Sequence, residues 1–229
     1  MIECTLKDRI CRVLINRANA DNAFTGAMTQ QLLEAMHNAA GTADIVTIEA
    51  AGPDFTVGRD RQEPKSGTPY ERFKVISDLN KAVSTFPGLT IAAARGRTFG
   101  FAVGLLMRSD LAIIGDDAVF VLDELKHGFP PTFIMEEILQ HLPIKRALDV
   151  VVSGRQWGAS EALEMGLVSR VVPSSDLDSV VEDLVAHLKR LNRQALLSCK
   201  GYMRTVATMP PEARDAYALL ETLRLASSA

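Results

Sequence analysis

The sequence predicts an α/β fold made of repeated strand–strand–helix units, followed by a C-terminal helical region. Short β-branched runs alternate with segments of helical periodicity, and strand, helix and strand recur about every 40 residues. With 229 residues the chain can bury one sizeable core, and we identify no linker or low-complexity segment in it. We therefore expect a core over residues 1–190 and a helical region over residues 191–229.

The N-terminal part begins with a predicted β-hairpin. Residues 2–6 and 10–15 alternate between apolar and polar side chains, and the polar residues 7–9 make the turn. Thr25 can then cap a helix, because the apolar residues between Met28 and Met36 follow helical spacing.

The central part alternates predicted strands and helices. In chain order we expect a strand at 45–50, a loop at 51–69, a helix at about 70–86, a strand at 89–93, a glycine-containing turn at 96–100, a helix at 102–108, and strands at 111–114 and 118–122. From about residue 133 the pattern is mostly helical, with one strand-like interruption at 167–173.

Composition excludes several classes of function. Hydrophobic residues make up 47% of the chain and charged residues 23%, and the net charge of −3 gives no reason to expect nucleic acid or an acidic membrane as a partner. No run of about 20 apolar residues predicts a membrane span. Three cysteines without metal-ligand spacing indicate free thiols and no metal site. We expect a cytoplasmic protein.

Two glycine-bearing turns are the first candidates for chemistry. Residues 55–60 (FTVGRD) follow one predicted strand, and residues 96–101 (GRTFGF) follow the next and open a helix. Glycine lets the chain turn tightly, and the first N–H groups of a helix have no partner within it. Two such donors that converge can stabilise an oxyanion formed from a carbonyl. Taken alone, such turns are more often plain architecture.

Taken together, these segments resemble the crotonase (enoyl-CoA hydratase/isomerase) family. Residues 91–100 (IAAARGRTFG), running into 109–112 (SDLA), are similar to the family signature, and residues 55–60 are similar to its first oxyanion loop. Asn16-Arg17 with Asn22-Ala23 matches near the N-terminus, and residues 154–168 match the "G…A.EA…GLV" block. The matches fall in order and cover nearly the whole chain.

The resemblance implies a crotonase-like spiral of ββα turns that binds a coenzyme A (CoA) thioester. It implies a homotrimer or a dimer of trimers, and no tightly bound cofactor beyond the CoA of the substrate. The backbone N–H groups of Arg59 and Phe101 would form the oxyanion hole, and Phe101 would narrow the acyl pocket. The residues expected to bind CoA or the substrate are Ala23, Phe24, Val57, Gly58, Asp60, Arg61 and Gly100.

The chain departs from the family at one of its two acids. Hydratases of the family generally use two glutamates, and the first would fall at Gly104, which cannot titrate, whereas the second is retained as Glu124. One carboxylate can remove a proton at one carbon of an enolisable thioester and return it at another. The resemblance therefore implies an acyl-CoA enzyme, more an isomerase than a hydratase, with Glu124 as acid/base.

Several alternatives stay open. Glu124 could be a solvated loop carboxylate, in which case the chain would bind acyl-CoA without efficient catalysis, as a binding or regulatory subunit. Asp123 is a weaker candidate base, because neighbouring side chains of an extended segment point to opposite faces. His127 could shuttle protons, contact the ligand, or be a surface or loop residue without function. Positive charge at Arg59, Arg61 and Lys65 would suit the phosphates of CoA, or the loop is merely solvated. The C-terminal region is short compared with the family.

Overall fold

The computed structural model describes residues 1–227 and divides the chain into two compact units, Met1–Val181 and Glu182–Ala229. The division falls within a helix, α7 (Leu177–Lys189). The proposed boundary after residue 190 stays a prediction.

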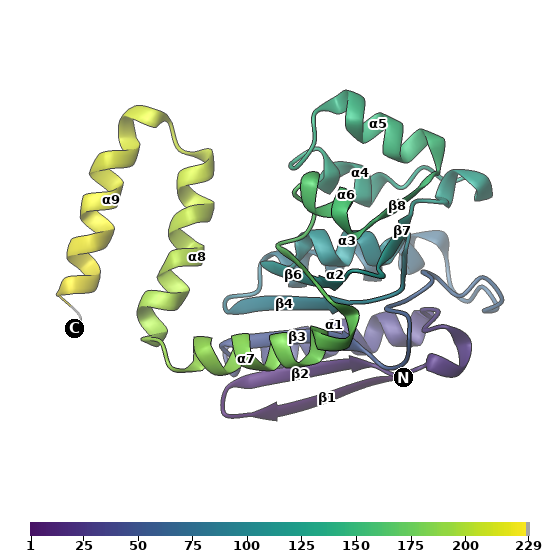
Figure 1. The fold of residues 1–229 in the computed structure, drawn as a ribbon, viewed down its shortest axis with the longest axis horizontal. Coiled ribbons are helices and arrows are strands. Elements are labelled where there is room, and N and C mark those ends of the chain that lie inside the picture. Colours follow the sequence, from purple (N-terminus) through teal and green to yellow (C-terminus); the bar gives the residue numbers. More distant parts are fainter. Residues whose placement is uncertain (228–229) are drawn as a thin grey trace. The chain divides into compact units, whose positions relative to one another are not determined.

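The larger sheet of the first unit contains six strands in the order β1-β2-β3-β4-β6-β9. They are β1 (Ile2–Lys7), β2 (Ile10–Ile15), β3 (Ile45–Ala50), β4 (Leu89–Ala94), β6 (Leu111–Gly115) and β9 (Arg170–Val172). The β1–β2 pair is the predicted antiparallel hairpin, and the other neighbours are parallel. Figure 1 shows β1, β2, β3 and β4 side by side. Strands β3, β4 and β6 are buried along most of their length on both faces, as is typical of parallel strands inside a sheet.

The smaller sheet lies at the carboxyl side of the larger one and has the order β5-β7-β8. Its strands are β5 (Arg97–Phe99), β7 (Val119–Val121) and β8 (Gln156–Gly158), and Thr56 adds a single parallel bridge to Thr98. Strands β3, β4 and β6 are therefore each followed by a segment of the smaller sheet and then by a helix or helical turn. This order produces the predicted spiral of ββα turns.

Helices connect the turns of the spiral. In chain order the first unit has η1 (Ala18–Ala20), α1 (Gly26–Ala39), α2 (Pro69–Ser84), α3 (Phe101–Arg108), η2 (Glu124–His127), α4 (Thr132–Ile138), α5 (Ile144–Ser153), α6 (Ala159–Glu164) and η3 (Ser174–Asp176), and then α7. The predicted cap is present, since Thr25 Oγ1 accepts a hydrogen bond from Met28 N at 3.1 Å. Helix α2 begins with a capping box between Thr68 and Glu71.

Two short strands differ from the sequence prediction. β5 occupies the predicted turn at 96–100, and β8 interrupts the stretch after residue 133 that we predicted to be helical up to 167. Strands of three residues are too short to show a period of two, so tertiary pairing decides them. In β8 this pairing includes Trp157, whose ring stacks on Phe120 of β7 with centroids 5.7 Å apart.

The second unit contains the helices α8 (Arg193–Thr208) and α9 (Pro211–Ala226), which form an antiparallel pair. Asn192 caps α8 by accepting a hydrogen bond from Ala195 N. Tyr202 and Tyr217 stack between the two helices, with ring centroids 5.5 Å apart. The helical region that we predicted at the C-terminus is present in this form.

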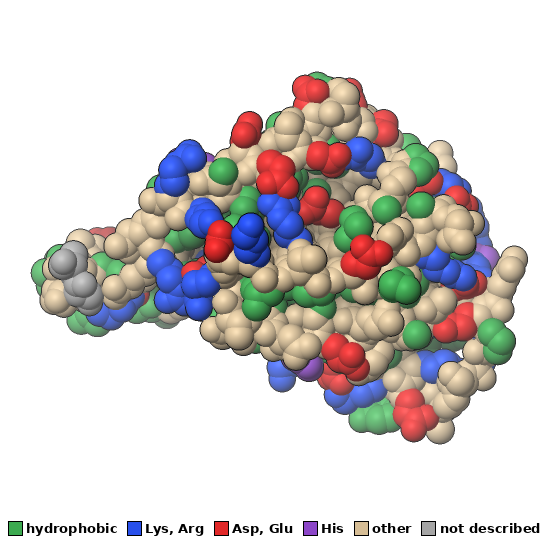
Figure 2. All heavy atoms as spheres, turned by 90° about the horizontal axis from the view of Figure 1, so that it is seen from below, with side chains coloured by type: hydrophobic (Ala, Val, Ile, Leu, Met, Phe, Trp, Pro, Cys, Tyr) green, Lys and Arg blue, Asp and Glu red, His purple; other side chains and the backbone are tan. Residues whose placement is uncertain are grey.

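Within residues 1–227 we find no helix that is both long and apolar enough to cross a bilayer. The face shown in Figure 2 carries Lys and Arg side chains interspersed with Asp and Glu. This mixture agrees with the small net charge of the chain.

Asn22 joins the N-terminal segment to the loop that follows β3. It is 1% exposed and has a left-handed backbone (φ 53°), which asparagine tolerates better than most residues. Its Nδ2 donates to Ala51 O and Asp54 O, both at 2.8 Å, and its Oδ1 accepts from Arg17 N at 2.8 Å. One side chain thus satisfies three backbone groups.

We expect Asn22→Ala to destabilise the protein by about 3 kcal/mol, because it leaves several buried backbone groups without partners. Urea unfolding followed by circular dichroism measures the effect. Asn38→Ala, on the exposed face of α1, is the matched control and should change stability by less than about 0.5 kcal/mol. Equal stability of the two variants would contradict this account of Asn22.

Candidate active site

The backbone of Arg59 is held by hydrogen bonds on both sides of it. Phe24 N donates to Gly58 O and Asp60 N donates to Phe24 O, both at 2.8 Å. In this parallel bridge the residue between the two bonded neighbours turns its own N–H away from the partner strand. Among the described residues, no hydrogen-bond acceptor takes the N–H of Arg59. It is a fixed and available donor.

A second backbone donor lies at the start of α3. Gly100 precedes the helix with φ 53° and ψ −121°, a conformation that essentially only glycine adopts, and Gly100 N donates to Val121 O at 2.8 Å. Phe101 is the first residue of the helix, so its N–H has no partner within the helix and lies at the positive end of the helix dipole.

The two loops meet because β5 pairs with the first loop. Thr56 N donates to Arg97 O and Phe99 N donates to Thr56 O, both at 3.0 Å. Gly58 (φ 87°) lies so close to this pair that a Cβ on it would be 3.2 Å from Phe99 O. The first loop is therefore fixed beside the start of α3, and Arg59 and Phe101 line one cavity.

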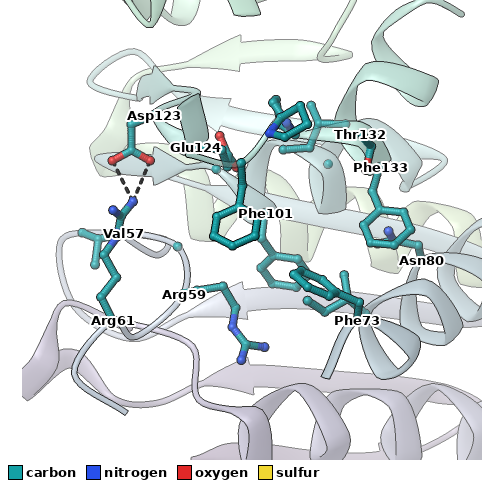
Figure 3. A pocket seen from close by; sticks show the side chains of 18 of the residues that line it. Val57, Arg59, Arg61, Phe73, Asn80, Phe101, Asp123, Glu124, Thr132 and Phe133 are labelled. Atoms are coloured by element: carbon teal, nitrogen blue, oxygen red, sulfur yellow. Dashed lines mark hydrogen bonds and ion pairs between the residues drawn. The ribbon is translucent and has the colours of Figure 1, made fainter. Parts of the chain in front are cut away.

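That cavity has a volume of about 410 Å³ and lies between the two loops, α2, α3 and the segment from η2 to α4. Most of its walls are apolar. The apolar lining residues are Val57, Phe73, Ile76, Phe101, Phe129, Pro130, Pro131, Phe133 and Ile134. The polar or charged ones are Arg59, Arg61, Asn80, Arg108, Asp123, Glu124 and Thr132. Figure 3 shows Glu124 and Phe101 toward one side of the cavity, and Asn80 and Phe133 toward the other.

Glu124 begins η2 and lies directly against Gly100. A Cβ on Gly100 would be 2.8 Å from Glu124 Oε1, so only a glycine leaves room for this carboxyl group beside the helix start. Glu124 Oε2 is buried and has no hydrogen-bond partner among the described residues. A buried carboxyl oxygen without a partner is costly in a purely structural role, which argues against the solvated-loop alternative.

Burial raises the pKa of Glu124 above its ordinary value, and the neighbouring carboxylate of Asp123 acts in the same direction. A hydrogen bond to the Glu124 backbone and the charge of Arg61 oppose this rise in pKa. A carboxylate with a raised pKa is a stronger base than an exposed one, and its protonated form is more populated, which suits a group that takes up a proton and returns it. The environment of Glu124 therefore suits an acid/base residue.

Asp123, the weaker candidate base, is already in contact with two side chains. Arg61 Nη2 lies 2.9 Å from both of its carboxylate oxygens, and His127 Nε2 lies 3.3 Å from Asp123 Oδ2. The dashed lines in Figure 3 mark the pair with Arg61. The contact between Arg61 and Asp123 connects the first loop to η2. Arg61 and His127, which we considered as ligand contacts, thus both have Asp123 as a partner within the protein.

At Gly104, the position where the resemblance places the missing glutamate, the neighbouring polar group is Arg108. A Cβ on Gly104 would be 3.0 Å from Arg108 Nη1 and 3.4 Å from Ile134 Cγ1. The guanidinium of Arg108 is buried, and burial lowers its pKa while Glu137 raises it. Where the two-glutamate arrangement would have an acid, this cavity has a buried cation.

The residues that we predicted to bind CoA or the substrate divide into two groups. Val57, Gly58, Arg61 and Gly100 line the cavity. Phe24 is fully buried, and its ring packs against Phe101 at a centroid distance of 5.1 Å. Arg17 Nη1 donates to both Ala23 O and Asp60 Oδ2 at 2.7 Å, so these two residues also have internal partners.

A second hollow of about 770 Å³ adjoins the cavity and shares Arg59, Arg61 and Glu124 with it. Asp60, Lys65 and Arg72 also line it. Asp60 holds Arg17 as described above, and Arg72 donates to Gly67 O at 2.8 Å. Lys65 makes no hydrogen bond or ion pair among the described residues. Its ammonium group can therefore meet an anionic ligand.

Sequence reasoning missed Asn80 and Arg108. Asn80 was one polar residue in a predicted helix, and Arg108 was the expected end of another. The helical spacing of residues 101, 104 and 108 could have placed Arg108 on the same helix face as Phe101. Only the fold shows that α2, with Asn80, lines the same cavity. Within residues 1–227 we find no group of three or more His, Cys, Asp or Glu side chains that could hold a metal ion.

Comparison with known proteins yields consistent matches. The family model "Enoyl-CoA hydratase/isomerase" matches residues 5–222. Hydroxycinnamoyl-CoA hydratase-lyase of Pseudomonas fluorescens is 26% identical over 215 residues, which is 89% of this chain and 78% of that protein. Carnitinyl-CoA dehydratase of Escherichia coli O157:H7 is 33% identical over 184 residues, 76% of this chain and 68% of that protein.

Solved structures confirm the predicted fold. A protein from Thermobifida fusca YX that was solved in complex with CoA superposes with a TM-score of 0.88 at 26% identity, covering 99% of this chain and 93% of that one. The enoyl-CoA hydratase of Mycobacterium smegmatis superposes with a TM-score of 0.86 at 25% identity, covering 97% and 89%.

We expect Glu124→Gln to unfold at higher urea concentration than the native protein at pH 7. A raised pKa means that the folded state binds the proton more tightly, so the stability contributed by protonation is complete below the unfolded pKa and is lost as the pH rises through the folded pKa. The glutamine variant stays neutral and avoids that loss. Its advantage at pH 7 should exceed about 0.5 kcal/mol, the usual range of exposed substitutions, and should shrink toward pH 4.

Glu164→Gln, on the exposed face of α6, is the control and should show no such pH-dependent advantage. A Glu124→Gln variant less stable than the native protein at pH 7 would show that the carboxylate is well solvated or paired, against this description of its environment.

Proposed function

The chain belongs to the enoyl-CoA hydratase/isomerase family, and on that basis we propose that it transfers a proton on the acyl group of a CoA thioester, with Glu124 as the single acid/base. The observation that carries the proposal is the position of the Glu124 carboxyl group. It lies against Gly100, immediately before the Phe101 N–H, and it lines the same cavity as Arg59.

The two backbone donors supply the electrostatic part of the reaction. When a proton leaves the carbon next to a thioester carbonyl, negative charge moves to the carbonyl oxygen. The N–H groups of Arg59 and Phe101 would bind that oxygen, and they need no rearrangement because backbone pairing already holds them. Loss of one such donor typically costs about 100-fold or more in rate.

Glu124 would then move the proton between two carbons. With a 3-enoyl-CoA, its carboxylate takes a proton from C2, and the electrons of the C–H bond form a dienolate. The protonated Glu124 returns the proton at C4, which yields the conjugated 2-enoyl thioester and regenerates the carboxylate. The reaction consumes no water and no second acid.

The isomerase assignment is the finer part of the proposal, and the cavity supports it at Gly104. Activation of water for hydration generally requires a second carboxylate, and beside Gly104 this chain has the guanidinium of Arg108. The relatives are a hydratase-lyase and a dehydratase by name, so hydration and dehydration are the reactions to test against it. Fold alone does not choose among them.

The CoA part of the ligand is supported by charge and by similarity. The hollow beside the cavity contains Lys65, a cation suited to the phosphates of CoA, and the similar Thermobifida fusca protein was solved with CoA bound. A homotrimer or a dimer of trimers stays part of this proposal by resemblance to the family, and a cytoplasmic location stays part of it as an expectation from the sequence composition.

The proposal is tested by incubating the purified protein with a 3-enoyl-CoA and following formation of the conjugated thioester. We expect turnover by the native protein and a decrease in kcat of at least about 100-fold in Glu124→Gln, because the variant cannot accept a proton. Glu164→Gln should retain native turnover.

Hydration of a 2-enoyl-CoA is measured in parallel. Turnover that survives Glu124→Gln would refute the assignment of the base. The native protein could instead hydrate the 2-enoyl-CoA without isomerising the 3-enoyl-CoA, with hydration lost in Glu124→Gln. That result would support Glu124 as the acid/base and would identify the reaction as hydration. Binding of acyl-CoA without either reaction would favour the non-catalytic alternative.

A further inference from the structure

Two polar side chains are buried in the otherwise apolar wall of the cavity. Asn80, on α2, is 8% exposed, and Arg108, on α3, is 7% exposed, and both line the cavity together with Phe133 and Ile134. A cavity that only had to hold a hydrocarbon chain would gain nothing from them, because burying polar groups costs free energy.

Asn80 lacks a partner within the protein. It makes no hydrogen bond to any described residue, although its amide group can donate two and accept two. The amide atoms of Asn80 are not among the fully buried polar atoms that lack a partner, so they are accessible from the cavity that Asn80 lines. A ligand atom in the cavity is the natural source of the missing hydrogen bond.

The guanidinium of Arg108 lies in the wall of the cavity that the acyl group is proposed to occupy. Phe101, Gly104 and Arg108 share one face of α3, and Gly104 lies one turn beyond the oxyanion donor Phe101, roughly 4.5 Å along the axis. Arg108 Nη1 donates to Gly104 O at 3.3 Å, which draws the guanidinium back toward this turn. If a thioester carbonyl is bound at the Phe101 N–H, the first few carbons of its acyl chain would lie near this guanidinium.

The remaining contacts of Arg108 decide which ligand chemistry fits. Nη2 donates to Phe133 O, and Nε lies 3.4 Å from the carboxylate of Glu137. Two of its five N–H groups donate hydrogen bonds and the Nε–H faces the carboxylate of Glu137, which leaves two N–H groups for a ligand. Glu137 compensates the positive charge, so a second carboxylate would be buried without a cation of its own. An uncharged oxygen needs no such compensation.

From these contacts we propose that the physiological acyl group carries an uncharged oxygen substituent, a hydroxyl or a carbonyl, within a few carbons of the thioester, and that Asn80 and Arg108 bind it. This inference rests on the proposed function, since it assumes that the acyl group of a CoA thioester occupies the cavity. Asn80 and Arg108 are in this view the residues that determine acyl specificity.

Calorimetric titration with unreactive thioesters tests this without turnover. The ligands are hexanoyl-CoA, its 4-oxo, 5-oxo and 6-hydroxy derivatives, and adipoyl-CoA, which carries a carboxylate. We expect at least one of the three oxygenated derivatives to bind about 10-fold more tightly than hexanoyl-CoA, which corresponds to one added hydrogen bond. Adipoyl-CoA should bind no more tightly than hexanoyl-CoA.

Asn80→Leu should remove most of this preference and leave the affinity for hexanoyl-CoA within about threefold, because it keeps a side chain of similar size. Ile76→Val, one turn earlier on α2 in the same wall, is the control and should keep the preference. The Asn80 variant is used because truncation of Arg108 would leave Glu137 unpaired.

Hexanoyl-CoA binding without preference for any of the oxygenated derivatives would overturn the inference and leave the proposed function intact. Tightest binding of adipoyl-CoA would overturn the choice of an uncharged group. A preference that persists in Asn80→Leu would refute the role of Asn80. Absence of binding by every thioester would contradict the proposed function itself.

Discussion

The backbone pairing of residues 54–60 with two separate parts of the chain is the constraint on which the site depends. On one side Phe24 bonds to both neighbours of Arg59, and on the other Thr56 bonds to both ends of β5. These bonds turn the Arg59 N–H outward and place it beside the start of α3. Asn22 holds the start of the same loop by donating a hydrogen bond to Asp54 O. Because backbone groups make these bonds, unusual side chains such as Arg59 and Phe101 do not alter the two donors.

The chemistry follows from the lack of space around Gly100. Its glycine-only conformation and missing Cβ let the Glu124 carboxyl group lie against the first turn of α3, where the apolar walls remove it from water. Burial then raises the pKa of Glu124 and makes it a usable base. One turn further along α3, Gly104 offers no second acid and Arg108 fills the space. Helix α3 thus provides the Phe101 donor, begins at the glycine against which Glu124 lies, and contributes the polar Arg108 to the cavity wall.

Much of this arrangement could be predicted from the sequence, and the rest depends on tertiary contacts. The hairpin, the Thr25 cap and the buried strands at 45–50 and 111–114 follow from local periodicity and capping. Strands β5 and β8 could not be predicted, because their pairing partners, not their own residues, form them. Glu124 was identified by resemblance, whereas its unpaired oxygen is visible only in the fold. Asn80 and Arg108 lie on different helices, and no sequence pattern relates them.

The most direct test of the central claim is exchange of the α-protons of butyryl-CoA with solvent deuterium, followed by NMR. This saturated thioester can neither isomerise nor take up water, so exchange reports only proton removal by a base beside an oxyanion hole. We predict exchange of an α-proton by the native protein and its loss in Glu124→Gln, with butyryl-CoA bound to both. Tight binding of butyryl-CoA to the native protein without any exchange would contradict the claim that Glu124 and the two backbone donors generate a thioester enolate.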